Sequence, residues 1–301
     1  MARTRAIVRT CLLFPAVVVV ASALGGCSPS RLSPPAPSPT LISLPTQLPD
    51  RISYADAMAL FAYDHTRPFD VRERSVTIES GALVHDISYL TSAGLRTQAY
   101  FVTPYGQGPF GAVMYLHGAF SGSSQFLPEA CDLAHRGVAS LLITQPEMDA
   151  EPLTDSAAIN EIVYEMRELQ RSLDLLADQP VVDSQRLGFV GFSYGAVRGA
   201  TFAGIESGRM RIAILMSTPP SYDAPAMVSF DPVVWVPRVS PASLFIQLGK
   251  QDTWFTHDAG ESLIAAAKAP KKLVWYDAGH GLDSNAYSDR ITWLTSALAR
   301  P

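Results

Sequence analysis

The sequence has few cysteines and none of the motifs that bind metals or nucleotides. Only three of its 301 residues are cysteine. No spacing of Cys, His and acidic residues is typical of a metal site, no P-loop is present, and no G-x-G-x-x-G stretch leads from a strand into a helix as a phosphate cradle does. We therefore expect no metal ion and no cofactor.

Acidic residues outnumber basic ones outside the N-terminus. The formal net charge is −5, and the first 26 residues contribute three arginines and no acid, so the remainder carries −8. A body this acidic, without a basic stretch, argues against nucleic acid as a partner. The content of 48% apolar and 17% charged residues is that of a globular protein rather than a disordered one.

The apolar run near the N-terminus is too short to span a bilayer comfortably. Basic "MARTRAIVRT" precedes "CLLFPAVVVVASAL", a run of about 14 residues that is followed by small ones, which is the plan of a secretory signal. The end of the run, "LGGC", resembles the lipobox of bacterial lipoproteins, in which Cys27 would be the lipidated first residue of the mature chain. The alternative is ordinary cleavage after Ala23, which would leave Cys27 as a free thiol on a secreted protein. On the lipobox interpretation Cys11 leaves with the signal and Cys27 is acylated, so Cys131 has no disulfide partner.

The chain is predicted to have three parts. Residues 1–26 form the signal peptide, residues 27–53 a lipidated linker dense in Pro and Ser, and residues 54–301 the globular domain. On this interpretation the protein is exported and anchored to a bacterial membrane through Cys27. Ser28, rather than Asp, after that cysteine favours the outer membrane or the cell surface by analogy with lipoproteins.

The globular part alternates strand-like and helix-like segments. Strands are predicted at 82–90, 97–104, 111–117, 138–144, 186–191, 211–217, 243–249 and 272–278. The first two look like a meander, whereas the later runs are almost wholly apolar, as expected for parallel strands covered on both faces. Helical patterns fill the gaps at 123–137, 155–179, 257–269 and 288–299. The sequence therefore predicts an α/β domain whose mostly parallel central sheet has about eight strands flanked by helices, with a short flap at 218–242.

A serine stands between two glycines where an apolar strand turns into a helix-forming segment. "GFSYG", residues 191–195, matches G-x-S-x-G, the nucleophile elbow of α/β-hydrolases, whose strained turn exposes the serine. Serine is a poor nucleophile at neutral pH and needs a base that is oriented by an acid. Asp252 and His280 follow later strands, in the required chain order of Ser, acid, His. We therefore predict that Ser193, Asp252 and His280 meet at the carboxyl edge of the sheet as nucleophile, orienting acid and base.

The donors that would bind an oxyanion are backbone N–H groups. One is that of Tyr194, and the other is that of Ala119, which follows the strand at 111–117 in "VMYLHGAF". Phe120 is the competing donor position. His117 is expected to hold this loop by a hydrogen bond rather than to act as a second base.

Each residue of the site also has a structural alternative. Ser193 could be a helix N-cap only, and Asp252 could cap the helix that follows it. Asp277 and Asp283 are rival acids near His280. Asp283 follows the histidine instead of ending a strand, so Asp252 is preferred.

Five stretches carry a resemblance to a known family: "YDHTRPFDV", "GPFGAVMYLHGAFSGSSQFLPEACDLAHRGVASLL", "VGFSYGA", "FDPVVWVPRVSPASLFIQLGKQD" and "WYDAGHGLDSNAYSDRITWL". Through them the chain resembles the dienelactone-hydrolase-like branch of the α/β-hydrolase superfamily, which implies an α/β-hydrolase domain over 54–301. Dienelactone hydrolases proper use a cysteine nucleophile, so Ser193 points instead to a general serine esterase. The resemblance also implies that "FDPVVWVPRV" packs near the site. Trp235 and Trp254, together with Phe120, are then possible pocket residues, with core or shell positions as the alternative.

The leading hypothesis is a membrane-tethered serine hydrolase that acts on small-molecule carboxylic esters. It would work through an acyl-enzyme on Ser193, and the short flap favours small to medium acyl groups. One alternative is an acylaminoacyl- or prolyl-peptidase-like hydrolase, although residues 28–80 cannot hold the large N-terminal domain that such enzymes usually carry. The other is a non-catalytic surface lipoprotein that retains the fold. Nothing in the sequence indicates an oligomeric state.

Overall fold

The structure, a computed structural model, describes residues 52–144, 155–218 and 225–300. The predicted signal peptide and all but the last two residues of the predicted linker lie outside the described residues. Within the described residues the strands form a nine-stranded sheet in the order β1-β2-β3-β5-β4-β6-β7-β8-β9. Their bounds are β1 Arg72–Glu79, β2 Ala82–Leu90, β3 Arg96–Thr103, β4 Phe110–Leu116, β5 Val138–Ile143, β6 Val182–Phe192, β7 Met210–Met216, β8 Ser243–Gly249 and β9 Lys271–Tyr276.

The parallel part of the sheet follows from the apolar runs. Strands β4 to β9 pair in parallel with one another, β5 pairs antiparallel with β3, and β4, β5 and β8 are buried almost from end to end. Strands β2 and β3 pair antiparallel, as the meander prediction expected. All eight predicted strands are present, and the mostly parallel α/β fold is confirmed.

Strand β1 is the one that the sequence analysis missed. It pairs antiparallel with β2 at the edge of the sheet, and every one of its residues is exposed. Its sequence, RERSVTIE, mixes charges into the alternation of apolar and polar residues. Charged side chains protect an edge strand from pairing with other chains, but they also remove the hydrophobic signal by which a strand is found.

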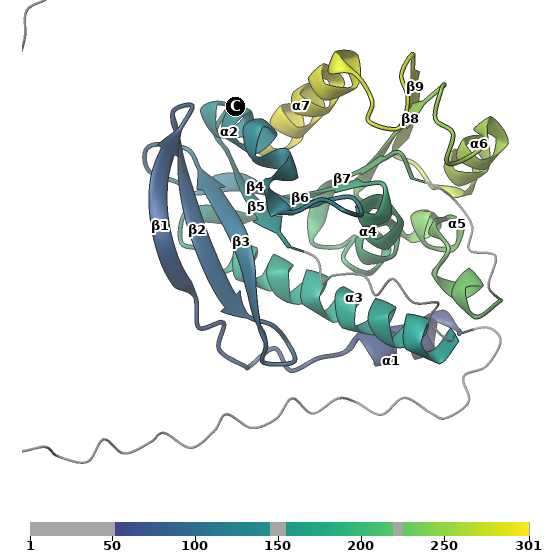
Figure 1. The fold of residues 1–301 in the computed structure, drawn as a ribbon, viewed down its shortest axis with the longest axis horizontal. Coiled ribbons are helices and arrows are strands. Elements are labelled where there is room, and N and C mark those ends of the chain that lie inside the picture. The colour runs from purple at the N-terminus through teal and green to yellow at the C-terminus, as the bar shows by residue number, and fades with distance from the viewer. Residues whose placement is uncertain (1–51, 145–154, 219–224, 301) are drawn as a thin grey trace, which may run out of the picture. The chain divides into compact units, whose positions relative to one another are not determined.

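Helices cover both faces of the sheet (Figure 1). They are α1 Tyr54–Phe61, α2 Leu127–His135, α3 Asp155–Ala177, α4 Tyr194–Ile205, α5 Pro232–Trp235, α6 His257–Ala266 and α7 Ser284–Leu298, with 3-10 turns η1 Ser123–Phe126, η2 Pro225–Phe230 and η3 Val236–Arg238. The side chains of β4 point alternately into the two hydrophobic clusters, one on each face of the sheet. Met114 and Leu116 pack with α1, α3, α4 and α6, whereas Val113 and Tyr115 pack with α2 and α7. None of the described helices is both long and apolar enough to cross a bilayer.

The described part of the predicted flap, residues 225–242, is packed into the core. Phe230, Val236 and Val239 are buried in the same hydrophobic cluster as α3 and α4. Trp235 is only 2% exposed, and its indole N–H donates to the Ser229 carbonyl oxygen over 2.9 Å. Its ring packs near those of Tyr54 and Phe61. Residues 219–224 lie outside the described residues.

Candidate active site

Ser193 sits in a strained turn between β6 and α4. Its φ of 53° and ψ of −119° are values that non-glycine residues rarely adopt. Its backbone N–H donates to the Met216 carbonyl oxygen over 2.8 Å, which ties the turn to the neighbouring strand β7. A Cβ atom on Gly195 would lie 2.4 Å from the His117 carbonyl oxygen, so only glycine lets α4 approach the end of β4 this closely.

His280 and Asp252 complete a chain of hydrogen bonds that starts at Ser193. The Nε2 atom of His280 lies 2.8 Å from the Ser193 Oγ, and its Nδ1 lies 2.7 Å from the Asp252 Oδ2. The Asp252 side chain is 0% exposed, and its other oxygen accepts the Trp254 backbone N–H over 2.9 Å. A buried carboxylate at Nδ1 keeps the proton on that nitrogen, which leaves the Nε2 lone pair directed at the serine hydroxyl.

The two rival acids have other partners. Asp277 accepts a hydrogen bond from the Gln251 amide over 2.5 Å. Asp283 is the N-cap of α7, where its Oδ1 accepts the backbone N–H of Ala286 over 2.9 Å. Among the described carboxylates, the one hydrogen-bonded to His280 is therefore that of Asp252.

Ser217, which the sequence analysis did not select, holds the loop that carries His280. Its hydroxyl donates to the His280 carbonyl oxygen over 2.6 Å, and the residue is fully buried at a φ of 49°. Since Ser193 bonds Met216 and Ser217 bonds His280, the residues at the end of β7 connect the serine turn with the histidine loop. A single serine after an apolar strand carries no sequence signal for this role.

The predicted oxyanion loop lies against Ser193. A Cβ atom on Gly118 would lie 2.8 Å from the Phe192 ring and 3.5 Å from the Ser193 Cβ. The loop is held by two hydrogen bonds: His117 Nδ1 donates to the Gly118 carbonyl oxygen over 2.8 Å, and the Gln125 side chain accepts the Gly118 N–H over 3.0 Å. Burial lowers the pKa of His117, so its imidazole is neutral at neutral pH.

Both N–H groups of the predicted oxyanion site are at positions that suit the task. Tyr194 is the first residue of α4, so its N–H has no helical carbonyl to bond. Ala119 directly follows Gly118 in the loop beside Ser193, and the next residue, Phe120, has a strained φ of 59°. Tyr194 thus follows Ser193 in the chain, and Ala119 lies in the loop that contacts Ser193 at the end of β4.

The side chain of Tyr194 is fixed by charged residues that sequence reasoning missed. Its hydroxyl donates to the Glu165 carboxylate over 2.8 Å and accepts from the Arg198 guanidinium over 2.7 Å. Arg198 and Glu165 also form a buried ion pair of 2.5 Å. Burial, with the Glu165 charge as a second cause, raises the pKa of Tyr194 far above its ordinary value, so the hydroxyl stays protonated. Glu165 comes from α3, more than 25 residues away in sequence, where periodicity indicates only a buried helix face, and Arg198 lies one turn further along α4.

The three aromatic residues predicted as possible pocket residues lie in different places. Phe120 is fully exposed on the oxyanion loop, and Trp254 is 74% exposed with its ring centroid 5.8 Å from that of His280. Trp254 therefore lies beside the candidate site, and Phe120 is exposed to solvent. Trp235 is buried with Phe61 and Phe230, which is the core alternative rather than a pocket wall.

Within residues 52–144, 155–218 and 225–300, no group of three or more His, Cys, Asp or Glu residues could hold a metal ion. The free thiol in these ranges is that of Cys131 on α2, which is buried against the sheet, and burial raises its pKa.

Comparison with known families decides the class of protein. The family described as Esterase FrsA-like matches residues 73–256, which is more than half of the chain. The chain belongs to the FrsA-like esterase family. This FrsA-like esterase is a hydrolase that acts on esters. A search of curated proteins finds no match to it.

Several solved structures share the fold of this FrsA-like esterase at low sequence identity. Acetyl xylan esterase 1 from Thermoanaerobacterium sp. JW/SL YS485 has a TM-score of 0.69 at 13% identity, over 80% of this chain and 92% of that chain. Acetyl xylan esterase from Paenibacillus sp. R4 has a TM-score of 0.66 at 17% identity, over 81% and 92%. An S-formylglutathione hydrolase from Agrobacterium tumefaciens has a TM-score of 0.61 at 14% identity, over 76% and 100%. These likenesses confirm the α/β-hydrolase fold that the sequence predicts.

Proposed function

We propose that this FrsA-like esterase is a serine carboxylesterase, a serine variant of the dienelactone-hydrolase-like branch, which needs no cofactor. It hydrolyses small-molecule esters with small to medium acyl groups through an acyl-enzyme on Ser193. The observation that carries the proposal is the hydrogen-bond chain from the Ser193 Oγ through His280 to the buried Asp252, at 2.8 and 2.7 Å. A helix N-cap alone would not require such a chain.

The reaction begins with attack of the Ser193 Oγ on the ester carbonyl carbon. His280 Nε2 takes the serine proton as the C–O bond forms, and the Asp252 carboxylate stabilises the imidazolium. When the tetrahedral intermediate collapses, the bond to the leaving alcohol breaks and His280 gives the proton to that oxygen. Water, deprotonated by His280, then attacks the acyl carbon; the bond to the Ser193 Oγ breaks, His280 returns the proton to that oxygen, and the acid is released.

The negative oxygen of the intermediate is bound by the backbone N–H groups of Tyr194 and Ala119, with Phe120 as the competing donor. Removal of one such donor typically raises the barrier by about 3 kcal/mol. The side-chain contacts of Tyr194 with Glu165 and Arg198 support this role, because they hold rigid the residue that offers the first N–H.

The proposal is tested by hydrolysis of p-nitrophenyl acetate by the parent protein and by Ser193→Ala. We expect the variant to lose at least about three orders of magnitude in kcat while unfolding at the same urea concentration as the parent. Trapping of a radioactive acetyl group on the parent, but not on the variant, would identify the acyl-enzyme. Equal rates in the two proteins would remove Ser193 from the mechanism.

We also propose that the protein is exported and held at a bacterial membrane by a lipid on Cys27. The support is the order of basic, apolar and small residues that ends in "LGGC", followed by the Pro- and Ser-rich linker. Mass spectrometry of the mature protein should find a diacylated Cys27 at its N-terminus, and Cys27→Ala should release the protein from the membrane fraction. A mature N-terminus between Ser22 and Ser28 that carries no lipid would contradict the anchor.

A further inference from the structure

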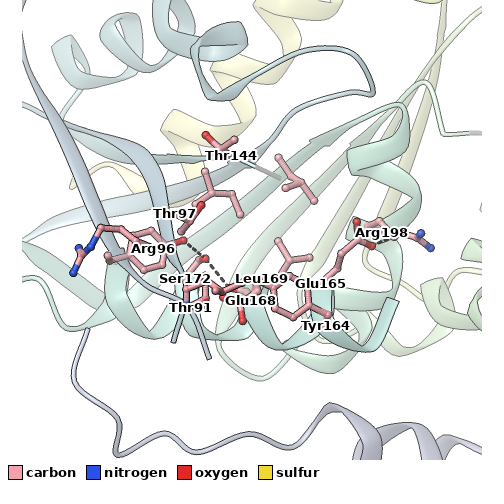
Figure 2. Close-up of a pocket in the computed structure, with 14 residues that line it drawn as sticks. Thr91, Arg96, Thr97, Thr144, Tyr164, Glu165, Glu168, Leu169, Ser172 and Arg198 are labelled. Atoms are coloured by element: carbon pink, nitrogen blue, oxygen red, sulfur yellow. Dashed lines mark hydrogen bonds and ion pairs between the residues drawn. The ribbon is translucent and has the colours of Figure 1, made fainter. Parts of the chain in front are cut away.

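A cavity of about 180 Å³ lies between α3 and the ends of β4 and β5, next to the candidate site. Figure 2 shows α3 side chains on one side of it, among them Tyr164, Glu165 and Glu168, with Thr144 and Thr97 opposite. Leu116, which also lines the cavity, directly precedes the loop of the proposed oxyanion site. The lining combines aliphatic and aromatic side chains with several hydroxyl groups, two carboxylates and two arginines.

One of those carboxylates, that of Glu168, has an oxygen without a hydrogen-bond partner among the described residues. Glu168 is 8% exposed, and its Oε1 accepts hydrogen bonds from the backbone N–H of Ser92, over 2.9 Å, and from the Ser92 hydroxyl. Its Oε2 is buried and has no hydrogen-bond partner in the described part of the chain. A buried carboxylate oxygen without a partner is costly, because it has lost its hydration and gained nothing in return.

The arginines near Glu168 make their hydrogen bonds and ion pairs with other groups, and one nitrogen of Arg171, Nη1, is buried without a hydrogen-bond partner among the described residues. Arg198 pairs with Glu165, and Arg96, whose guanidinium points away from the cavity in Figure 2, pairs with Asp70. Arg171, on the same helix as Glu168, donates to the backbone carbonyls of Leu90 and Pro68. The structure thus leaves the Glu168 Oε2 free to accept a hydrogen bond from a ligand in the cavity.

The order of the strands indicates which part of an ester this cavity faces. Ser193 follows β6, and His280 and Asp252 follow β9 and β8 on one side of it. The cavity lies on the opposite side, at β4, β5 and β3. The leaving oxygen must lie at His280 to receive its proton, so the acyl substituent points away from the histidine, towards the cavity.

We propose that the cavity is the acyl-binding pocket of this FrsA-like esterase and selects acyl groups that end in a hydrogen-bond donor, a hydroxyl or an ammonium group, which bonds the Glu168 carboxylate. This inference rests on the proposed function. The volume suits an acyl chain of six or seven non-hydrogen atoms, since a cavity of roughly 150 Å³ accommodates benzene. A longer chain without a donor would leave the carboxylate unsatisfied.

The experiment compares three p-nitrophenyl esters of equal acyl length: heptanoate, 6-hydroxyhexanoate and 6-ammoniohexanoate. Their acyl groups end in CH₃, OH and NH₃⁺. A hydrogen bond to a charged group supports a preference of about tenfold or more in kcat/KM over heptanoate. Preference for the ammonium ester over the hydroxyl ester, or the reverse, identifies which donor the pocket takes. Heptanoate hydrolysed as well as or better than both would overturn the inference.

Glu168→Gln tests the carboxylate itself. The amide oxygen can still accept both hydrogen bonds from Ser92, but an NH₂ group replaces the free oxygen. The ratio of kcat/KM for the ammonium ester over heptanoate should fall about tenfold, and that for the hydroxyl ester about threefold. Each ratio is measured within one protein preparation, so a partly unfolded sample does not change it. Asp178→Asn, which removes an exposed carboxylate just after α3, should leave both ratios unchanged.

Thr97→Phe tests the cavity independently of the carboxylate. The larger side chain fills the space, so the ratio of heptanoate to acetate hydrolysis should fall about tenfold or more. Unchanged ratios in both Glu168→Gln and Thr97→Phe, with acetate hydrolysis still dependent on Ser193, would overturn this inference and leave the proposed function standing. Acetate hydrolysis that does not depend on Ser193 would overturn both.

Discussion

Gly195→Ala adds one methyl group and should disturb the candidate active site by displacing the backbone at the start of α4. The new Cβ would lie 2.4 Å from the His117 carbonyl oxygen and 2.5 Å from that of Leu116, whereas ordinary contacts begin at 3.4 Å. The start of α4 must therefore move away from the end of β4 by about 1 Å. Both partners are backbone atoms at the end of a buried strand, so the strand cannot easily give way.

The expected loss is larger for activity than for stability. Overpacking of this kind costs about 1–3 kcal/mol, and the better helix propensity of alanine offsets roughly 1 kcal/mol of it. A displacement of about 1 Å at a catalytic centre can by itself lower the rate about 100-fold. The displaced residues include Ser193 and the Tyr194 N–H, so the loss should appear in kcat rather than in KM.

The assay is steady-state hydrolysis of p-nitrophenyl acetate, with urea unfolding of the same preparations. Gly208→Ala is the matched control, because a Cβ there meets nothing within 4 Å and the residue lies in the turn after α4. We expect Gly208→Ala to keep the kcat of the parent. If the kcat of Gly195→Ala stays within about threefold of the parent, the argument that this contact positions the site is wrong.

Three further changes have equally definite expected results. Asp252→Asn should lower kcat about 10³- to 10⁴-fold with little change in the unfolding free energy. The amide oxygen can keep the hydrogen bond from the Trp254 backbone N–H, while the NH₂ group faces His280 and favours the wrong tautomer of its imidazole. A loss of kcat below tenfold would contradict this. Arg290→Met should lower the unfolding free energy by about 3–5 kcal/mol, because it leaves the buried Glu129 carboxylate without its ion pair of 2.5 Å. Adding Glu129→Gln to the same chain should restore part of that loss, as measured by urea unfolding. Burial raises the pKa of Glu168 above the ordinary 4.5, so the folded state holds this proton more tightly than the unfolded state. The unfolding free energy of the parent relative to Glu168→Gln should therefore fall as pH rises from about 4.5 through the raised pKa, and a difference that grows with pH would refute the shift.

Most of the sheet could be predicted because its strands are buried on both faces. Strands such as β5, VASLLI, are apolar throughout, and such runs are visible without any knowledge of their neighbours. Edge strand β1 has no buried face, and α1 has only eight residues, so neither carries enough pattern to be recognised. The start of α7 was missed by four residues because its cap, Asp283, precedes the periodic part of the helix.

The positions of Ser193, Asp252 and His280 could be predicted because chain order and strand ends are properties of the sequence. All three follow apolar strands, and parallel strands bring their carboxyl ends to one edge. The choice among Asp252, Asp277 and Asp283 depends instead on distances of an ångström or two. Only the folded loops, tied together through Ser217, determine those distances.

By itself the sequence determined the class of fold, the order of the chemical groups along the chain and the serine that stands in the elbow. These are local patterns, each written in fewer than about fifteen neighbouring residues. The tertiary structure alone decided that Trp235 belongs to the core, that Ser217 holds the histidine loop, and that Glu168 faces a cavity beside the oxyanion loop. Each of these depends on contacts between segments far apart in the chain. How deeply a side chain is buried and what it bonds to are properties of the packed molecule, and no single segment of sequence determines them.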